Sequence, residues 1–518
     1  MWEQKTASER VSDQWDALVA EEVNVQRLTR EMNLANLSRT DVRIVHGAHL
    51  YLDITNIRHL VDSAVLRRED FKPLHRYMHV LWIELRRIIQ QVFDGDKVQV
   101  QGQKFHGLLH KPYDDDETLA WHSILIAIAF TETVRRSLPL VFSDYPPMTP
   151  TIGIDLGDTV VANVGARGNR ELISIGSAAN HAAKILGEPN AITVTSDVWS
   201  ALPDDHRELF AESGDDYRID WLAVGDAEAL LDEFGFGWSV EDSARRMQLT
   251  VDGLPLSSIE SHAAEVRINV EDLGPKHFKT CTAGTIFVDI DGYTALIDSL
   301  MDDEEELVKA VKLLHLFRHE LHCVTSSDFD GVEIQHQGDR LQAIIHLPTD
   351  DEDRIKEKVA EMCISFNSSV EQVLNANHVI FDKYHVAIGA AYGKTIVVRS
   401  GTRGDLDVGC FGDAVLRAEV QQMRSKGNEI RIAKDVFASI TNETIRTLFK
   451  FDNENDCYKA DELTWSKLED AESSKQYAAK ASVGFNAVTR RIEFDRGGSK
   501  GPSTPQVVPL KNTRNWGL

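Results

Sequence analysis

The sequence predicts a mixed α and β protein in which one unit occurs twice. Two observations support this prediction. Several words recur along the chain at a constant distance, and within each copy β-branched words typical of strands alternate with segments whose apolar residues recur every three to four positions. A length of 518 residues allows two to four domains, and 42% hydrophobic with 27% charged residues is typical of a globular protein with a sizeable core.

The repeat becomes visible when the chain is compared with itself at the shift that places Asp53 on Asp289, which we call the repeat offset. Four words match at this one offset without a gap, which chance similarity rarely produces, so we interpret them as a duplication. The matching words are LYLDITNIRHLVD (50–62) and IFVDIDGYTALID (286–298), VQVQGQKFHGLLHKP (98–112) and IQHQGDRLQAIIHLP (334–348), TIGIDLG (151–157) and AIGAAYG (387–393), and GARGNRELISIGSAAN (165–180) and GTRGDLDVGCFGDAVL (401–416).

The repeat also sets the expected domain boundaries. Segments such as DEEELVKAVKLLHLFRHELHCV (303–324) have the apolar spacing of a helix, and the stretch between the copies is polar and weakly periodic, as in a connector. The expected parts are a helical N-terminal segment (1–41), a first unit (42–225), a connector (226–279), a second unit (280–470) and a Gly/Pro/Ser-rich tail (471–518).

Charge and hydropathy exclude several classes of protein. A net charge of -26 argues against a protein that wraps nucleic acid or lies on an anionic membrane, because both tasks need a cationic face. The longest apolar run, ILIAIAF at 124–130, is far shorter than the roughly 18 residues of a membrane span. The N-terminus lacks the basic and apolar regions of a signal peptide, so we expect a cytoplasmic protein.

Two carboxylates of the second unit suggest a metal site. Asp289 ends an apolar strand, and Asp339 lies 50 residues later in the Gly338-Asp339 turn of an expected hairpin. Mg²⁺ and Mn²⁺ take oxygen ligands and leave positions for phosphates. A pair of such ions can stabilise the attacking and leaving oxygens of phosphoryl transfer.

The first unit lacks this pair. It keeps Asp53 but has Gln103 at the position of Asp339, and a neutral amide is a poor substitute for a metal-binding carboxylate. We therefore expect metal ions only in the second unit.

The opposite asymmetry occurs on a predicted helix. The first unit has Asn180 and Lys184, four residues apart on one helix face, where the second has Leu416 and Val420. If the two units pair about a pseudo-twofold axis, each of two equivalent clefts mixes residues from both units. One mixed cleft then contains both the carboxylate pair and the Asn-Lys pair, and the other cleft contains neither pair.

These motifs together resemble the class III nucleotidyl cyclases. The matching words are FVDIDGYT at 287–294, the Gly338-Asp339 turn, and GSAANHAAK at 176–184. The resemblance covers about 42–225 and 280–470. It implies an α+β fold of two tandem ferredoxin-like domains that form an intramolecular pseudo-heterodimer in a monomeric chain.

The resemblance assigns the metal ligands by position. Asp289 and Asp339 would bind two divalent ions, Mn²⁺ or Mg²⁺, with help from the backbone carbonyl of Ile290. The implied reaction is attack of the ribose 3′-oxygen of a nucleoside triphosphate on its α-phosphate, with loss of pyrophosphate.

Three residues of the first unit take substrate roles in the same resemblance. Asn180 would orient the ribose, and Lys184 stands where the family has an arginine that stabilises charge on the phosphates. Lysine keeps the charge but loses the two-pronged contact of a guanidinium. Arg218 falls near the lysine with which the family binds the triphosphate.

The expected base-reading positions depart from both purine patterns of the family. They are occupied by Gln99 and Ile173, where adenylyl cyclases have lysine with aspartate or threonine, and guanylyl cyclases have glutamate with cysteine. A change of pocket polarity predicts a change of base. The wording GSAANHAAK also resembles the pyrimidine cyclases of bacterial Pycsar anti-phage systems, so we expect CTP, or else UTP, as substrate.

Two alternatives remain open from the sequence. One is an adenylate or guanylate cyclase. The other is a catalytically inactive cyclase pair that binds a nucleotide and regulates a partner, which the missing arginine would favour. For an active pyrimidine cyclase, the resemblance implies a cyclic CMP or cyclic UMP messenger and a separate effector protein, without a nucleic acid or membrane partner.

Overall fold

The computed structural model describes residues 2–34, 37–38, 40–61, 71–164, 171–220, 226–377, 383–402 and 405–473. Met1–Trp465 form one compact unit, which contains both copies of the repeat, and Ser466–Leu518 form a second unit. Most of the predicted tail, 471–518, lies outside the described residues.

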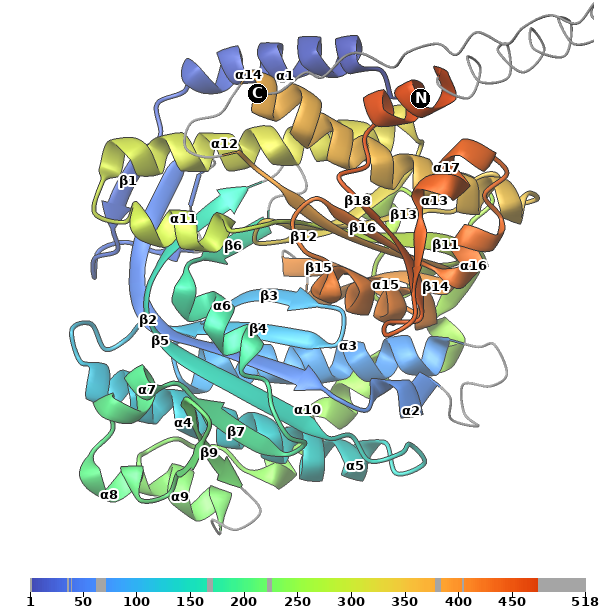
Figure 1. Ribbon diagram of the computed structural model, residues 1–518. Coiled ribbons are helices and arrows are strands. Elements are labelled where there is room, and N and C mark those ends of the chain that lie inside the picture. Colours follow the sequence, from blue (N-terminus) through green and yellow to red (C-terminus); the bar gives the residue numbers. More distant parts are fainter. Residues whose placement is uncertain are drawn as a thin grey trace, which may run out of the picture. The chain divides into compact units, whose positions relative to one another are not determined.

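Two nine-stranded sheets of the same order form the framework (Figure 1). The first has the order β3-β4-β2-β5-β7-β9-β8, with β1 on β2 and β6 on β5. The second has the order β12-β13-β11-β14-β16-β18-β17, with β10 on β11 and β15 on β14. The predicted α+β class with two like units is confirmed. The strands are β1 (Asn24–Arg27), β2 (Asp41–Ile54), β3 (Asp96–Gln101), β4 (Lys104–Leu109), β5 (Pro150–Val164), β6 (Glu171–Ile175), β7 (Ala191–Val194), β8 (Ala211–Ser213), β9 (Asp216–Asp220), β10 (Glu260–Ala263), β11 (His277–Ile290), β12 (Val332–Gln337), β13 (Arg340–Ile345), β14 (Val386–Thr402), β15 (Asp405–Phe411), β16 (Glu429–Ala433), β17 (Lys450–Asp452) and β18 (Cys457–Asp461).

The helices also occur in corresponding places of the two halves. In the first half α4 packs on β2 and β5, and in the second α13 packs on β11 and β14. The helices are α1 (Gln4–Val19), α2 (Ile57–Val61), α3 (Lys72–Arg87), α4 (Asp116–Glu132), α5 (Leu138–Val141), α6 (Ser177–Lys184), α7 (Ser196–Ala201), α8 (Asp204–Arg207), α9 (Ala227–Glu233), α10 (Val240–Gly253), α11 (Tyr293–Ser299), α12 (Glu304–Cys323), α13 (Glu352–Ser368), α14 (Asn375–Asn377), α15 (Asp413–Arg424), α16 (Lys434–Ala438) and α17 (Glu443–Leu448).

Local sequence explains where the long helices begin. The side chain of Asp303 accepts a hydrogen bond from the backbone N–H of Glu306 (3.1 Å) and so caps α12. Asp115 caps α4 in the same way through Thr118 (3.0 Å). The apolar run at 124–130 is buried core of α4. Among the described residues, no helix combines the length and the apolar character that a membrane crossing requires.

Helices α6 and α15 lie close to the central strands of their sheets. A Cβ atom at Gly153 of β5 would come within 2.1 Å of the Ala182 carbonyl of α6, and a Cβ at Gly389 of β14 would meet the backbone of Gln422 of α15 at the same distance. Only glycine allows backbones to approach in this way. These two glycines therefore fix the positions of the helices that carry Asn180 and Leu416.

The repeat extends further than the four sequence words indicate. The predicted N-terminal segment (1–41) contains α1 followed by β1, and the predicted connector (226–279) contains α10 followed by β10. Asn24 of β1 pairs with Asp41, and Glu260 of β10 pairs with His277, so the two pairings are related by the repeat offset. We call each helix–strand pair an arm.

Each arm crosses between the halves. Strand β1 joins the first sheet while α1 packs on α12 of the second half, and β10 joins the second sheet while α10 packs on α3 of the first (Figure 1). The four repeated words lie outside the arms, and the arms share few identities besides Arg10 with Arg246 in the helices and Trp2 with Trp238 just before them.

The arginines that the two arms share make equivalent ion pairs. Arg10 binds both carboxylate oxygens of Glu320 on α12 (2.6 and 2.7 Å) and also pairs with Asp328 (2.9 Å). Arg246 binds Glu84 on α3 at 2.8 Å. Glu84 and Glu320 are almost fully buried and occupy corresponding positions of the repeat, so the same polar contact holds both exchanged helices.

Candidate active site

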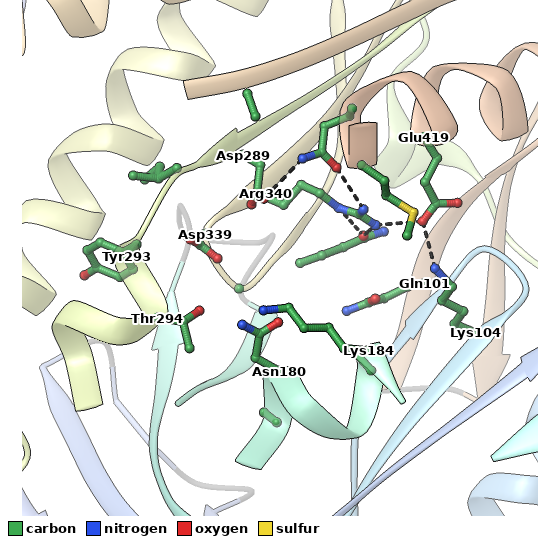
Figure 2. Close-up of a pocket in the computed structure, with 18 of the residues that line it drawn as sticks. Gln101, Lys104, Asn180, Lys184, Asp289, Tyr293, Thr294, Asp339, Arg340 and Glu419 are labelled. Carbon is green, nitrogen blue, oxygen red and sulfur yellow. Dashed lines mark hydrogen bonds and ion pairs between the residues drawn. The ribbon is translucent and has the colours of Figure 1, made fainter. Parts of the chain in front are cut away.

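A cavity of about 920 Å³ lies where the two halves meet, and it contains most of the predicted site residues (Figure 2). Its lining comes from β11, the turn between β12 and β13, and α15 of the second half, and from β2, β4 and α6 of the first. The residues that matter below are Tyr51, Asp53, Gln101, Gln103, Lys104, Ser174, Asn180, Lys184, Asp289, Ile290, Thr294, Asp339, Arg340, Leu416, Glu419, Val420 and Gln422.

Asp289 lies next to the end of β11, where the apolar strand leaves the core. Its Oδ2 accepts a hydrogen bond from the side-chain amide of Gln422 on α15 (3.2 Å). After the strand, the chain turns through Gly292, whose φ of 76° is left-handed. Tyr293 then anchors the turn, because its buried hydroxyl donates to the carbonyl of Ala310 (2.7 Å).

Asp339 occupies a two-residue hairpin turn between β12 and β13. Gln337 pairs with Arg340 across the turn, and Gly338 has a left-handed φ of 66°, a conformation that such turns require and glycine adopts without strain. A Cβ at Gly338 would lie 4.0 Å from the side chain of Ile175, which ends the strand before α6. The turn therefore points at the first half.

The electrostatics of the two carboxylates suit a cation. Burial raises the pKa of Asp289, and burial followed by the charge of Asp289 raises the pKa of Asp339 well above its usual range. Two ionised carboxylates that disfavour each other's charge gain when a divalent cation lies between them.

The donor set also fits Mg²⁺ or Mn²⁺. Carboxylate oxygens are the hard ligands these ions prefer, and Ile290, whose backbone carbonyl is the third predicted ligand, also lines the cavity. Across the described part of the chain, no group of three or more His, Cys, Asp or Glu side chains is suited to hold a metal. The remaining ligands would therefore have to come from water or from substrate phosphates.

Asn180 and Lys184 face this pair from the other half. Figure 2 shows both side chains on α6, directed into the space below Asp339. The N-terminus of α6 is held by the second half, since Asp298 of α11 accepts a hydrogen bond from the backbone N–H of Ser177 (2.8 Å) and a short one from its hydroxyl. The structure thus brings the four central predicted residues to one cavity.

A network of hydrogen bonds and ion pairs around Arg340 joins residues of both halves at the cavity. Arg340 donates to Gln337 (2.9 Å) and Gln422 (3.3 Å) and pairs with Glu419 (3.0 Å). Lys104 of the first half also pairs with Glu419 (2.9 Å). Burial alone would raise the pKa of Glu419, but the charges of Lys104 and Arg340 hold it at about 2. Gln422 also donates to Asp289, so this network connects Arg340 to the carboxylate of Asp289.

The equivalent positions on the opposite side of the cavity are Asp53, Gln103, Leu416 and Val420, and all four line it. Burial raises the pKa of Asp53 to about 6, although Lys104 opposes this shift. We call these four positions the depleted side, and Asp289, Asp339, Asn180 and Lys184 the complete side.

Three predicted residues do not line the cavity. Gln99 is buried at the junction of the halves, where its amide donates to the carbonyl of His336 (2.5 Å) and its oxygen accepts from Gln101 (3.0 Å). Ile173 is buried in β6 and Arg218 lies on β9, and neither belongs to the lining. Their functional roles remain predictions.

Sequence reasoning missed several lining residues. Arg340 directly follows the predicted Asp339, and Lys104 is its counterpart in the first unit, so the repeat could have identified this pair of cations. Glu419 gave a weaker signal, since its counterpart is Ala183. Tyr51, Gln101 and Ser174 each follow an apolar residue on their strands, and only the structure shows which face borders the cavity.

Comparison with known proteins agrees with this geometry. Residues 276–462 match the adenylate and guanylate cyclase catalytic domain. A Pseudomonas aeruginosa protein named uridylate cyclase is 26% identical over 491 residues, covering 91% of this chain and 93% of that protein. A second uridylate cyclase, from a Rhizobium species, is 23% identical over 436 residues and covers 78% of this chain and 80% of its own.

A solved structure has the same fold along most of the chain. It is described as a class III adenylyl cyclase-like ATP-binding protein from Pseudomonas aeruginosa, with a TM-score of 0.77, 23% identity, and coverage of 91% of this chain and 99% of that one. The predicted tandem arrangement is therefore confirmed at the level of the fold. Residues 276–462 of the chain are thus similar to the adenylate and guanylate cyclase catalytic domain, and most of its length is similar to proteins named uridylate cyclase.

Proposed function

We propose that this protein converts UTP to 3′,5′-cyclic UMP and pyrophosphate. The observation that carries the proposal is the complete side of the cavity, where Asp289 and Asp339 lie opposite Asn180 and Lys184. The choice of UTP over CTP is supported by the two similar proteins named uridylate cyclase.

The chain's own residues would act mainly by positioning and electrostatics. Asp289, Asp339 and the carbonyl of Ile290 would hold two divalent ions, which supply positive charge to the phosphates and lower the pKa of the attacking hydroxyl. Asn180 would bind the ribose so that its 3′-oxygen is in line with the α-phosphate. Lys184 would stabilise the negative charge that develops as pyrophosphate leaves.

Base recognition would use the cavity wall of the first half. Gln101 and Ser174 line the cavity, whereas the amide of Gln99 is already bonded to His336 and Gln101. An amide and a hydroxyl can satisfy the donor and acceptor groups on the edge of a pyrimidine ring. We therefore assign base contact to Gln101 and Ser174, with Gln99 orienting Gln101 through their hydrogen bond. We assign Arg218 no contact with the substrate, because it does not line the cavity.

The direct test is a product assay with purified protein, Mn²⁺ and each of the four nucleoside triphosphates in turn. Cyclic UMP identified by mass spectrometry is expected as the main product. A cyclic CMP product would keep the pyrimidine class and change the base. A product from ATP or GTP alone would contradict the proposal and favour a purine cyclase.

The rival from another class is an inactive nucleotide-binding cyclase pair. Asp289→Ala separates the two, because it should abolish product formation in a cyclase while leaving the thermal unfolding midpoint close to that of the unmodified protein. If the unmodified protein forms no cyclic product yet binds a triphosphate, the inactive pair is the better description.

The wider role proposed for the product follows the Pycsar resemblance. A cyclic pyrimidine nucleotide would act as a messenger to a separate effector protein during phage infection, and the enzyme would work in the cytoplasm as a monomer. Phage challenge of cells with the gene and with its Asp289→Ala variant tests this role, and mass measurement in solution tests the monomer.

A further inference from the structure

A buried arginine stands behind the turn that carries Asp339. Arg318 lies on α12 with only 6% of its surface exposed, and its guanidinium donates to the carbonyl of Gly338 (2.9 Å). A buried cation is costly unless it has partners, so its presence here calls for a reason.

The other half shows what this position looks like without the arginine. The residue at the corresponding position of the repeat is Trp82, which is 4% exposed and packs against Phe105 with ring centroids 6.2 Å apart. The fold of the repeat therefore accepts an apolar side chain at this place. The arginine occurs in the half whose turn has Asp339, and the tryptophan in the half whose turn has Gln103.

The helix that carries Arg318 is itself held from outside the second half. Glu320, two residues further along α12, is the carboxylate that Arg10 of the exchanged helix α1 binds at 2.6 and 2.7 Å. The hydroxyl of Ser369 donates a further hydrogen bond to Glu320 (2.6 Å). These contacts limit movement of α12 close to the point from which Arg318 reaches the turn.

We propose that Arg318 is a positioning residue for the cyclase reaction, which holds the Gly338-Asp339 turn in the geometry that receives a divalent ion. This inference rests on the proposed function for the identity of the reaction. Arg318 acts through the turn and does not line the cavity.

The test compares Arg318→Trp, which copies the first half, and Arg318→Lys with Trp82→Phe as the matched control. Hydrogen–deuterium exchange of residues 334–342 is measured in metal-free protein. Arg318→Trp should speed exchange at the turn about tenfold, Arg318→Lys should lie between, and Trp82→Phe should leave the turn unchanged. Binding of Mn²⁺, followed by its electron paramagnetic resonance signal, should weaken about 10- to 100-fold in Arg318→Trp and less in Arg318→Lys.

The outcomes separate this inference from the proposed function. Unchanged exchange at the turn and unchanged Mn²⁺ affinity in Arg318→Trp would overturn the positioning role, whatever the activity. If Arg318→Trp does not fold, Arg318→Lys provides the test. The positioning role would be overturned if Arg318→Lys had the same exchange at the turn, the same Mn²⁺ affinity and the same turnover as the wild type. A wild-type protein that forms no product from any triphosphate would overturn the function, while faster exchange in Arg318→Trp would still support the role of the arginine in the turn.

Discussion

The complete side and the depleted side of the cavity have the same backbone framework but different polar residues. Both sides have the same strands, the same turn and the same helix, in sheets of identical order. They differ at the positions on which the proposed reaction depends: Asp339 corresponds to Gln103, Asn180 to Leu416, and Lys184 to Val420. The comparison teaches that the backbone supplies two equivalent places, and that the proposed difference in metal and nucleotide binding between them depends on side chains.

The largest expected effect comes from the carboxylates. Asp339→Asn should reduce kcat on the order of 10³-fold, equal to about 4 kcal/mol of transition-state stabilisation, because the amide cannot hold the metal ions. Asp53→Asn on the depleted side should change kcat less than about threefold. Pyrophosphate release measures both. Equal losses in the two variants would show that the two sides are not functionally different.

The next effect concerns α6. Asn180→Leu and Lys184→Val give the complete side the residues of the depleted side, and each should reduce kcat by about 10²-fold, since each removes a group that meets charge or ribose in the transition state. Leu416→Asn is the control on the opposite helix and should leave kcat near that of the wild type. A larger change in KM than in kcat for Lys184→Val would assign this lysine to substrate binding.

The arms extend the comparison from activity to stability. Arg10→Met leaves two buried carboxylates, Glu320 and Asp328, without their cation and should cost about 3 kcal/mol of unfolding free energy. Arg246→Met should cost less, because Glu84 keeps its pair with Arg87 (2.9 Å). Urea unfolding followed by tryptophan fluorescence measures the difference. A greater loss in Arg246→Met would contradict the assigned contacts.

The smallest effect is a pH dependence at a position where the two halves have different residues. Hydrogen bonds to Asp158 (2.8 Å) and then to Asp116 (2.9 Å) raise the pKa of His46, where the second half has Thr282. A raised folded-state pKa gives a stabilisation that is complete below pH of about 6.5 and is lost as the pH rises through the folded-state value. His46 is partly exposed, so the contribution should be under about 1 kcal/mol.

Thermal melts between pH 5.5 and 8.5 check this prediction. The wild type should lose stability across this window relative to His46→Thr, which copies the second half. The same ion pair holds the pKa of Asp158 at about 2, so the wild type should also lose stability as the pH falls towards that value. Parallel curves for the two proteins would remove His46 as the source.

The sequence alone predicted the repeat, the fold class and the four residues of the complete side. Those predictions succeeded because the segments near the cavity are similar enough in the two halves to be aligned at the repeat offset. The alignment then shows which half lacks each polar residue. The cavity then confirms that these residues share one site, although their catalytic roles remain proposals.

Other parts of the site depend on which way a side chain points. Gln99 and Gln101 lie on the same strand two residues apart, yet only Gln101 borders the cavity, because Gln99 reaches across to the carbonyl of His336. Arg318 gave no signal at all, since an arginine within a helix usually faces solvent. The exchange of the arms was hidden because it depends on contacts between segments some 310 residues apart, such as Arg10 with Glu320.

The exchanged helix α1 has a consequence for how the protein is made. Residues 4–19 leave the ribosome before α12, the surface on which they pack, which follows only after some 300 further residues. At about 5–20 residues per second, the apolar side of α1 waits on the order of 15 to 60 seconds for its place. A newly made first half also lacks the residues of the second half that line the cavity, so the cavity is complete only after the chain has been translated and folded beyond α15.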